Sequence, residues 1–196
     1  MKRSLVGMAL ALPMLLTACS DPPGTNDPGT TEHALTQRLD EIAAAVADWR
    51  DASTIEEAHA AAEAARNLVV GPDGPGYGDA DADGTVGGTA ERGLLPGLTD
   101  EPGIAEDGPL SACVEADVLG GAWDDRATRW ATAQAVYDAW TPTNNTMPSL
   151  PSHPQRIVGW ATLTLATDSL DEAHEYAGHA QLHVDVSRSA VGSCSS

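Results

Sequence analysis

The chain has 196 residues, and its 29 Asp and Glu against 10 Lys and Arg give a formal net charge of −19. This balance excludes a nucleic-acid partner and direct adhesion to anionic lipid, because there is no basic surface to neutralise phosphates. The length is sufficient for one domain with a core, together with short appendages.

The first twenty residues have the pattern of a secretion signal. Two basic residues are followed by a mostly apolar run at 5–16, which is too short to span a bilayer stably. The sequence LTAC at 16–19 then resembles the lipobox of bacterial lipoproteins. The resemblance implies cleavage after residue 18 and lipidation of Cys19, which would anchor the chain to a membrane outside the cytoplasm. A plain secretory signal with an unrelated Cys19 is the alternative.

The expected organisation has three parts. Residues 1–18 are a lipoprotein signal peptide, and residues 19–31, rich in Pro, Gly, Asp and Thr, are a flexible tether. Residues 32–196 form the helical domain. Within it, Cys113 and Cys194 are expected to form a disulfide in an oxidising compartment, and two free thiols are the alternative.

Apolar residues recur every three or four positions through most of the body, which predicts an all-α bundle of about five helices. A loop dense in Gly, Pro and Asp interrupts the pattern at 71–108. The predicted helices are 32–51, 55–70, 125–140, 154–167 and 170–187, with a further short helix at 110–119.

An internal repeat relates two of these helices. Residues 55–69 align without gaps to 170–184, beginning with IEEAH and LDEAH. Each copy carries a narrow alanine stripe, which predicts two related helical hairpins whose alanine-bearing helices pack against each other. The alternative is an alanine-rich composition without a repeat. The stripes comprise Ala58, Ala62 and Ala65, and Ala173, Ala177 and Ala180.

The sequence DADADGTV at 79–86 resembles the first eight positions of an EF-hand-type calcium loop. Asp79, Asp81 and Asp83 would supply carboxylates, and Thr85 a backbone carbonyl, while Gly84 permits the tight turn. Hard oxygen ligands of this kind favour Ca²⁺ over softer metals.

This loop departs from the EF-hand pattern in two respects. Position twelve is Ala90 instead of a bidentate Glu, and Glu91 or a remote acid such as Asp100 could complete the shell. No predicted helix directly flanks the loop, which argues against a helix-opening switch. We expect a structural ion bound weakly, with a dissociation constant on the order of 10⁻⁴ M. A solvated acidic turn without an ion is the alternative.

Histidines suggest a second kind of site. The two in HEYAGH at 174–179 are five residues apart, which excludes the HExxH zinc motif. The repeat-matched His59 and His174, with Glu63, are candidate ligands for a transition metal or haem, and His179 and His183 share a separate stripe. Boundary or solvent-exposed histidines are the alternative.

The sequence contains no GxSxG, GxGxxG, P-loop, HExxH or CxxC motif. The favoured interpretation is an extracytoplasmic, membrane-anchored lipoprotein that binds calcium. It would act as a non-enzymatic binding or interaction module for an unknown protein or small molecule. A transition-metal or haem-binding bundle for envelope metal handling is the alternative, and an enzyme remains a third class.

Overall fold

The computed structural model describes residues 28–88, 90–108 and 111–193, and it describes side chains from Glu32 onward. The predicted signal peptide, Cys19 and the tether up to residue 27 lie outside the described residues, as does Cys194. Within the described part the chain is helical and has no β-strand, so the predicted all-α bundle is confirmed. Its α-helices are α1 (Pro28–Asp51), α2 (Ile55–Val70), α3 (Arg126–Asp138), α4 (His153–Thr164) and α5 (Leu170–Ser193). Short 3-10 or π turns are η1 (Ile104–Glu106), η2 (Val114–Leu119) and η3 (Met147–Ser149).

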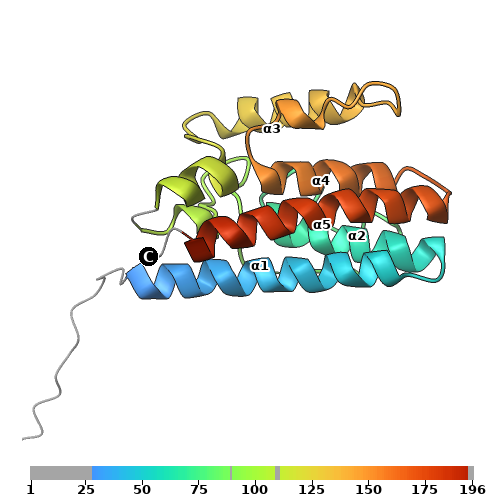
Figure 1. Ribbon diagram of the computed structural model, residues 1–196, viewed down its shortest axis with the longest axis horizontal. Helices are drawn as coiled ribbons and strands as arrows, with labels where there is room; N and C mark the ends of the chain where they lie inside the picture. The colour runs from blue at the N-terminus through green and yellow to red at the C-terminus, as the bar shows by residue number, and fades with distance from the viewer. Residues whose placement is uncertain (1–27, 89, 109–110, 194–196) are drawn as a thin grey trace, which may run out of the picture.

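Four of the helices form the bundle, and α3 lies outside it against α4 (Figure 1). Helix α1 packs on α2 and α5, and α4 packs on α5 and α2. Helices α2 and α5 therefore occupy diagonal corners, and they contact each other less than they contact α1 and α4. The two alanine-bearing helices do approach each other across this diagonal, as expected, although their main neighbours are α1 and α4.

The size of the core side chains explains this arrangement. The alanines of both stripes are fully buried, and they face neighbours that carry large side chains. Helix α1 contributes Ile42 and Trp49 to the core, and α4 contributes Ile157 and Trp160, each at most 2 % exposed. Small residues on one diagonal thus leave room for large residues on the other, which fills the centre of the bundle.

Contacts at equivalent positions of the two hairpins agree with the predicted repeat. His59 Nε2 lies 2.9 Å from the carbonyl oxygen of Thr167, and His174 Nε2 lies 2.9 Å from that of Ala52. Ala52 and Thr167 occupy equivalent positions of the repeat. Each hairpin therefore uses its histidine to bind the turn of the other hairpin, and the exchange satisfies carbonyls at the ends of α1 and α4.

The helix ends follow local rules, and several bounds differ from the sequence prediction. Thr54 caps α2 by accepting the backbone N–H of Glu57 at 3.2 Å. Helix α1 starts at Pro28, inside the predicted tether, where a proline is tolerated because the first helical N–H needs no partner. Helix α4 ends three residues earlier than predicted, and α5 continues to Ser193.

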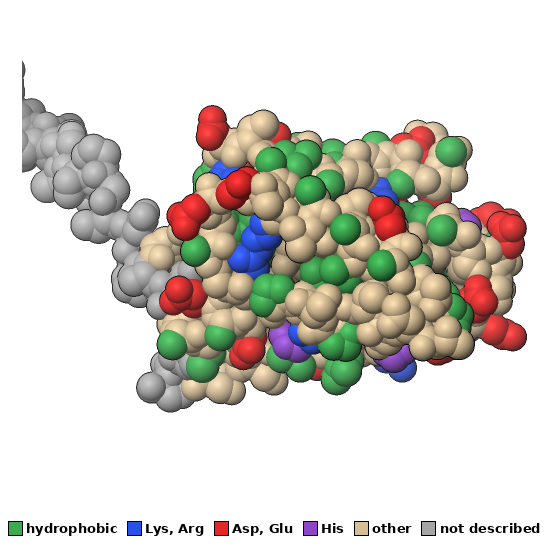
Figure 2. Space-filling model, turned by 90° about the horizontal axis from the view of Figure 1, so that it is seen from above, with side chains coloured by type: hydrophobic (Ala, Val, Ile, Leu, Met, Phe, Trp, Pro, Cys, Tyr) green, Lys and Arg blue, Asp and Glu red, His purple; other side chains and the backbone are tan. Residues whose placement is uncertain are grey.

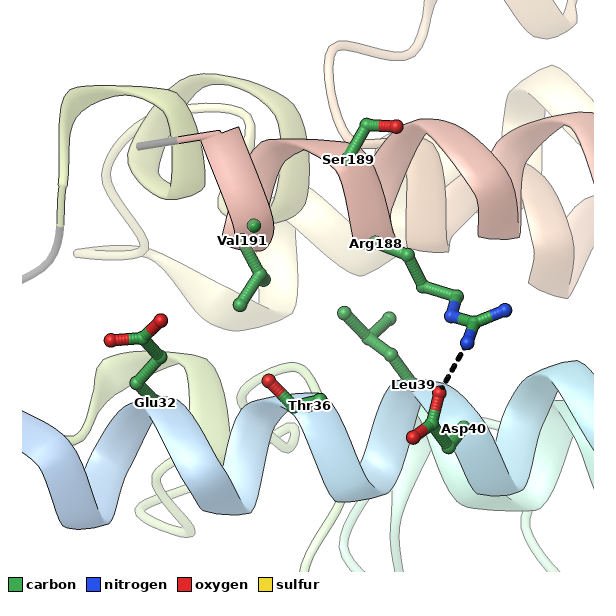
Figure 3. A pocket seen from close by; sticks show the side chains of 8 residues that line it. Glu32, Thr36, Leu39, Asp40, Arg188, Ser189 and Val191 are labelled. Carbon is green, nitrogen blue, oxygen red and sulfur yellow. Dashed lines mark ion pairs between the residues drawn. The ribbon is translucent and has the colours of Figure 1, made fainter. Parts of the chain in front are cut away.

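Between α1 and α5, Arg188 reaches Asp40 at 2.7 Å, and the side chains of the buried Leu39 and Val191 lie to one side of this pair (Figure 3). Both charged groups are half exposed, so the pair contributes little to stability. Carboxylates occur at several separate places on the face shown in Figure 2, mostly toward its edges. Among the described helices, none combines the length and apolar character needed to cross a membrane.

Candidate metal centre

One face of α2 is polar and nevertheless buried. Glu63, Arg66 and Asn67 follow one another at helical spacing and are 1 %, 7 % and 0 % exposed. The loop that follows α2 folds back over this face and covers it. Buried polar groups require partners, and the loop backbone supplies them.

Glu63 is the main attachment point of the aspartate loop. Its Oε2 accepts the backbone N–H groups of Ala80 and of Asp81, the latter at 3.2 Å. Its Oε1 accepts the N–H of Gly87 at 2.8 Å. One carboxylate therefore binds both ends of the turn at 80–87, and hydrogen bonds of this charged kind are stronger than neutral ones.

Asn67 and Arg66 secure the flanks of the same loop. The Asn67 amide donates to the carbonyls of Gly78 and Gly87 at 3.1 and 2.8 Å, and it accepts the N–H of Gly78 at 3.2 Å. Arg66 donates to the carbonyl of Gly76. The loop is thus ordered on the helix by side-chain to backbone hydrogen bonds.

The turn brings two of the predicted ligands onto Glu63. Carboxylate oxygens of Glu63, Asp79 and Asp81 all lie within 4.8 Å of one another, a group that could hold a metal ion. Backbone N–H groups shape the turn, since Gly84 donates to Asp79 at 3.0 Å and Asp83 donates to Asp81 at 3.1 Å.

The remaining predicted ligands lie outside this group. Asp83 and Thr85 are exposed, and the Asp83 carboxylate accepts the N–H of Thr85 at 2.6 Å. Glu91 is also exposed. Sequence reasoning had placed Glu63 with the histidines, whereas the structure places it with Asp79 and Asp81.

The electrostatics of the group favour a cation. Burial, followed by the nearby charges of Glu63 and Asp83, raises the pKa of Asp81, while the N–H of Asp83 opposes the shift. Arg66 is close enough for Glu63 to act on it, although burial lowers the pKa of its guanidinium. Three carboxylates and one guanidinium leave two negative charges, which suits a divalent ion.

The donor set also fits a hard ion. Each carboxylate oxygen has more than one lone pair, so an oxygen that accepts an N–H can also coordinate a cation. All three donors are oxygens, the ligand type of Ca²⁺ and Mg²⁺.

Comparisons with protein-family models, with curated proteins and with solved structures find no match to this chain.

The four candidate histidines do not join a comparable group. His59 and His174 bind backbone carbonyls, and His179 stacks on the ring of Trp160 with centroids 4.4 Å apart. In the part of the chain that the structure describes, the carboxylate group is the only set of three or more potential metal ligands.

His183 instead pairs with His153, a residue that the sequence analysis did not single out. Their Nδ1 atoms are 3.0 Å apart, so one ring carries its proton at Nδ1 and the other accepts it. Burial, followed by the charges of His153, Arg156 and His179, lowers the pKa of His183 to about 3. Burial and Arg156 also lower the pKa of His153, against an opposing contribution from Asp117.

This pair predicts a loss of stability in acid. The unfolded chain protonates His183 near its ordinary pKa of 6.5, whereas the folded chain does so only near 3. Stability is therefore complete above pH 6.5 and falls as the pH decreases from 6.5 toward 3, by at most about 1.4 kcal/mol per pH unit for one proton. The free energy of unfolding, measured with a chemical denaturant across this pH range, should therefore decrease less steeply toward acid in His183→Gln than in the wild type.

The exposed His33 offers a matched control, because His33→Gln removes an imidazole without touching the His153–His183 pair. All remaining titratable groups are common to the three proteins, so the effect of His183 is the difference between their slopes of unfolding free energy against pH. Equal slopes in His183→Gln and the wild type would show that the pair does not couple protonation to folding.

Cys113 is the N-cap of η2 and is disulfide-bonded. Cys194, its expected partner, lies outside the described residues, so the pairing of these two cysteines stays a prediction. Such a bond would tie the end of α5 to η2, which already contact each other.

Proposed function

We propose that this protein is a lipid-anchored lipoprotein of the cell envelope in which a calcium ion stabilises the long loop against α2. The observation that carries the metal proposal is the convergence of the buried Glu63 with Asp79 and Asp81. The ion would bridge helix and loop at the point where backbone hydrogen bonds already join them. Its role would be structural.

Calcium is favoured over other ions by the character of the site. The ligands are carboxylates on an irregular turn, and Ca²⁺ tolerates irregular geometry and high coordination number better than Mg²⁺ does. Two of the three ligands come from a partly exposed turn, which leaves positions for water or for backbone carbonyls. Such a site suits the weak affinities of extracellular modules.

The proposed location rests on the N-terminal sequence. The apolar run at 5–16 and the LTAC segment at 16–19 support export and lipidation of Cys19, and the polar stretch after Cys19 would separate the bundle from the membrane. The body would then act as a non-enzymatic binding or interaction module. Its partner is a protein or small molecule outside the cytoplasm.

Thermal melting tests the calcium proposal. With a dissociation constant on the order of 10⁻⁴ M, roughly 10 mM Ca²⁺ is about 100 times that constant and adds about 2.7 kcal/mol to the free energy of unfolding. The midpoint should rise by about 5–10 °C relative to protein in EGTA. Asp81→Asn should melt at the same temperature with and without calcium.

Asp124→Asn is the matched control, because Asp124 is an exposed acid outside the metal group. It should keep the calcium response. Elemental analysis of protein purified without chelator distinguishes the alternatives, since copper, iron or zinc would support a transition-metal or haem site. Equal midpoints of the wild type in calcium and EGTA would refute the structural ion.

A further inference from the structure

Three aromatic rings from separate segments of the chain meet beside the C-terminal end of α3. Trp140 follows α3, Trp160 belongs to α4 and Tyr176 belongs to α5. The Trp140 centroid lies 5.7 Å from that of Trp160 and 5.5 Å from that of Tyr176, both edge-on, and Trp160 stacks on Tyr176 at 5.6 Å. A cavity of about 210 Å³ opens beside these rings.

The same cavity is lined by two carboxylates of α5. Glu172 and Glu175 are exposed residues one turn apart, on the side of α5 that carries Tyr176. Burial, followed by the charges of Glu172 and Glu175, raises the pKa of the Tyr176 phenol. In the described residues that line this cavity there is no Lys or Arg to offset the two carboxylates.

The internal repeat shows that bundle packing does not require this chemistry. The positions of α2 equivalent to Glu175, Tyr176 and His179 are Ala60, Ala61 and Ala64. There the calcium-type loop lies directly on the helix, since a Cβ added at Gly88 would lie 2.2 Å from the Ala64 oxygen. The first hairpin covers this face with its own loop, whereas the second leaves a cavity walled by rings and acids.

We propose that this cavity binds a methylated ammonium group, such as the head of choline or a trimethylated amine. The face of an aromatic ring attracts a weakly hydrated cation, and nearby carboxylates add a charge of the right sign. An apolar ligand would gain nothing from Glu172 and Glu175, and an anion would be repelled by them. The proposal is independent of the metal centre, because no residue is shared between the two sites.

Ligand-observed NMR of choline with the purified protein tests the proposal, with 3,3-dimethylbutan-1-ol as the neutral ligand of the same shape. Choline should bind roughly tenfold or more tightly than the neutral analogue. Equal binding of the two ligands, or binding of neither, would overturn the proposal.

Variants assign the binding to this cavity. Trp140→Leu should weaken choline binding roughly tenfold. Glu175→Gln, at an exposed position, should weaken it severalfold without disturbing the core, whereas the exposed Asp171→Asn on the same helix should leave it unchanged. Unchanged binding in Glu175→Gln and Trp140→Leu would place choline elsewhere and refute the assignment. Phosphatidylcholine vesicles, compared with free choline, distinguish a lipid head group from a soluble ligand.

Discussion

Glu63→Ala is expected to lower the free energy of unfolding by about 3–5 kcal/mol and to abolish the response to calcium. The substitution removes the acceptor of three backbone N–H groups, at Ala80, Asp81 and Gly87, in a place that water does not reach freely. It also removes the buried member of the metal group. Urea unfolding in EGTA and in calcium separates the two losses.

The loss of hydrogen bonds appears in EGTA, and the loss of the ion appears as a wider gap between wild type and variant in calcium. Glu63→Gln keeps one acceptor oxygen, so it should retain more stability than Glu63→Ala in EGTA while remaining insensitive to calcium. Glu56→Ala, an exposed change on the same helix, is the control and should keep the response. If calcium stabilised Glu63→Ala and wild type equally, Glu63 would not be a ligand.

Gly71→Ala is expected to cost at least about 3 kcal/mol, because it combines two backbone conflicts. Gly71 ends α2 with φ 68°, a conformation that side chains disfavour. A Cβ at this position would lie 2.1 Å from the backbone nitrogen of Gly93, where the returning loop crosses the helix end. The crossing allows Leu94 N–H to bind the Leu68 carbonyl at 3.1 Å, so the loop and the helix would separate together.

Gly178→Ala provides the opposite expectation. Gly178 lies within α5, and a Cβ there would meet nothing within 4 Å. Alanine should therefore stabilise the protein by roughly 0.5–1 kcal/mol through helix propensity. Urea unfolding of both variants measures the contrast, and a Gly71→Ala protein as stable as wild type would mean that the crossing can relax.

The sequence pattern did not predict that the polar residues of α2 hold the loop, although their spacing along the helix is regular. Glu63, Arg66 and Asn67 interrupt an alanine-rich helix at spacings of three and four, immediately before a loop poor in apolar residues. A polar stripe beside such a loop is a natural surface for backbone groups that lack a sheet or helix. Periodicity alone assigns that stripe to solvent, because it does not show that the loop returns to cover it.

Local interactions determined the helices, because caps and breakers act over a few residues. As expected, Thr54 caps the start of α2 and Gly71 caps its end. Asp125 caps the start of α3 by accepting the N–H of Thr128 at 3.0 Å. The long ordered loop and the relation between the two hairpins were also readable from composition and repetition.

Tertiary structure decided which faces meet. A small-residue stripe permits close approach without naming the neighbour, so only the packing of the large side chains of α1 and α4 placed α2 and α5 on a diagonal. Likewise, the local sequence around Glu63 does not determine whether its carboxylate faces solvent, histidines or a loop. The return of residues 76–87 onto α2 set that choice, because hydrogen bonds between distant segments depend on the whole fold and leave no periodic trace in the chain.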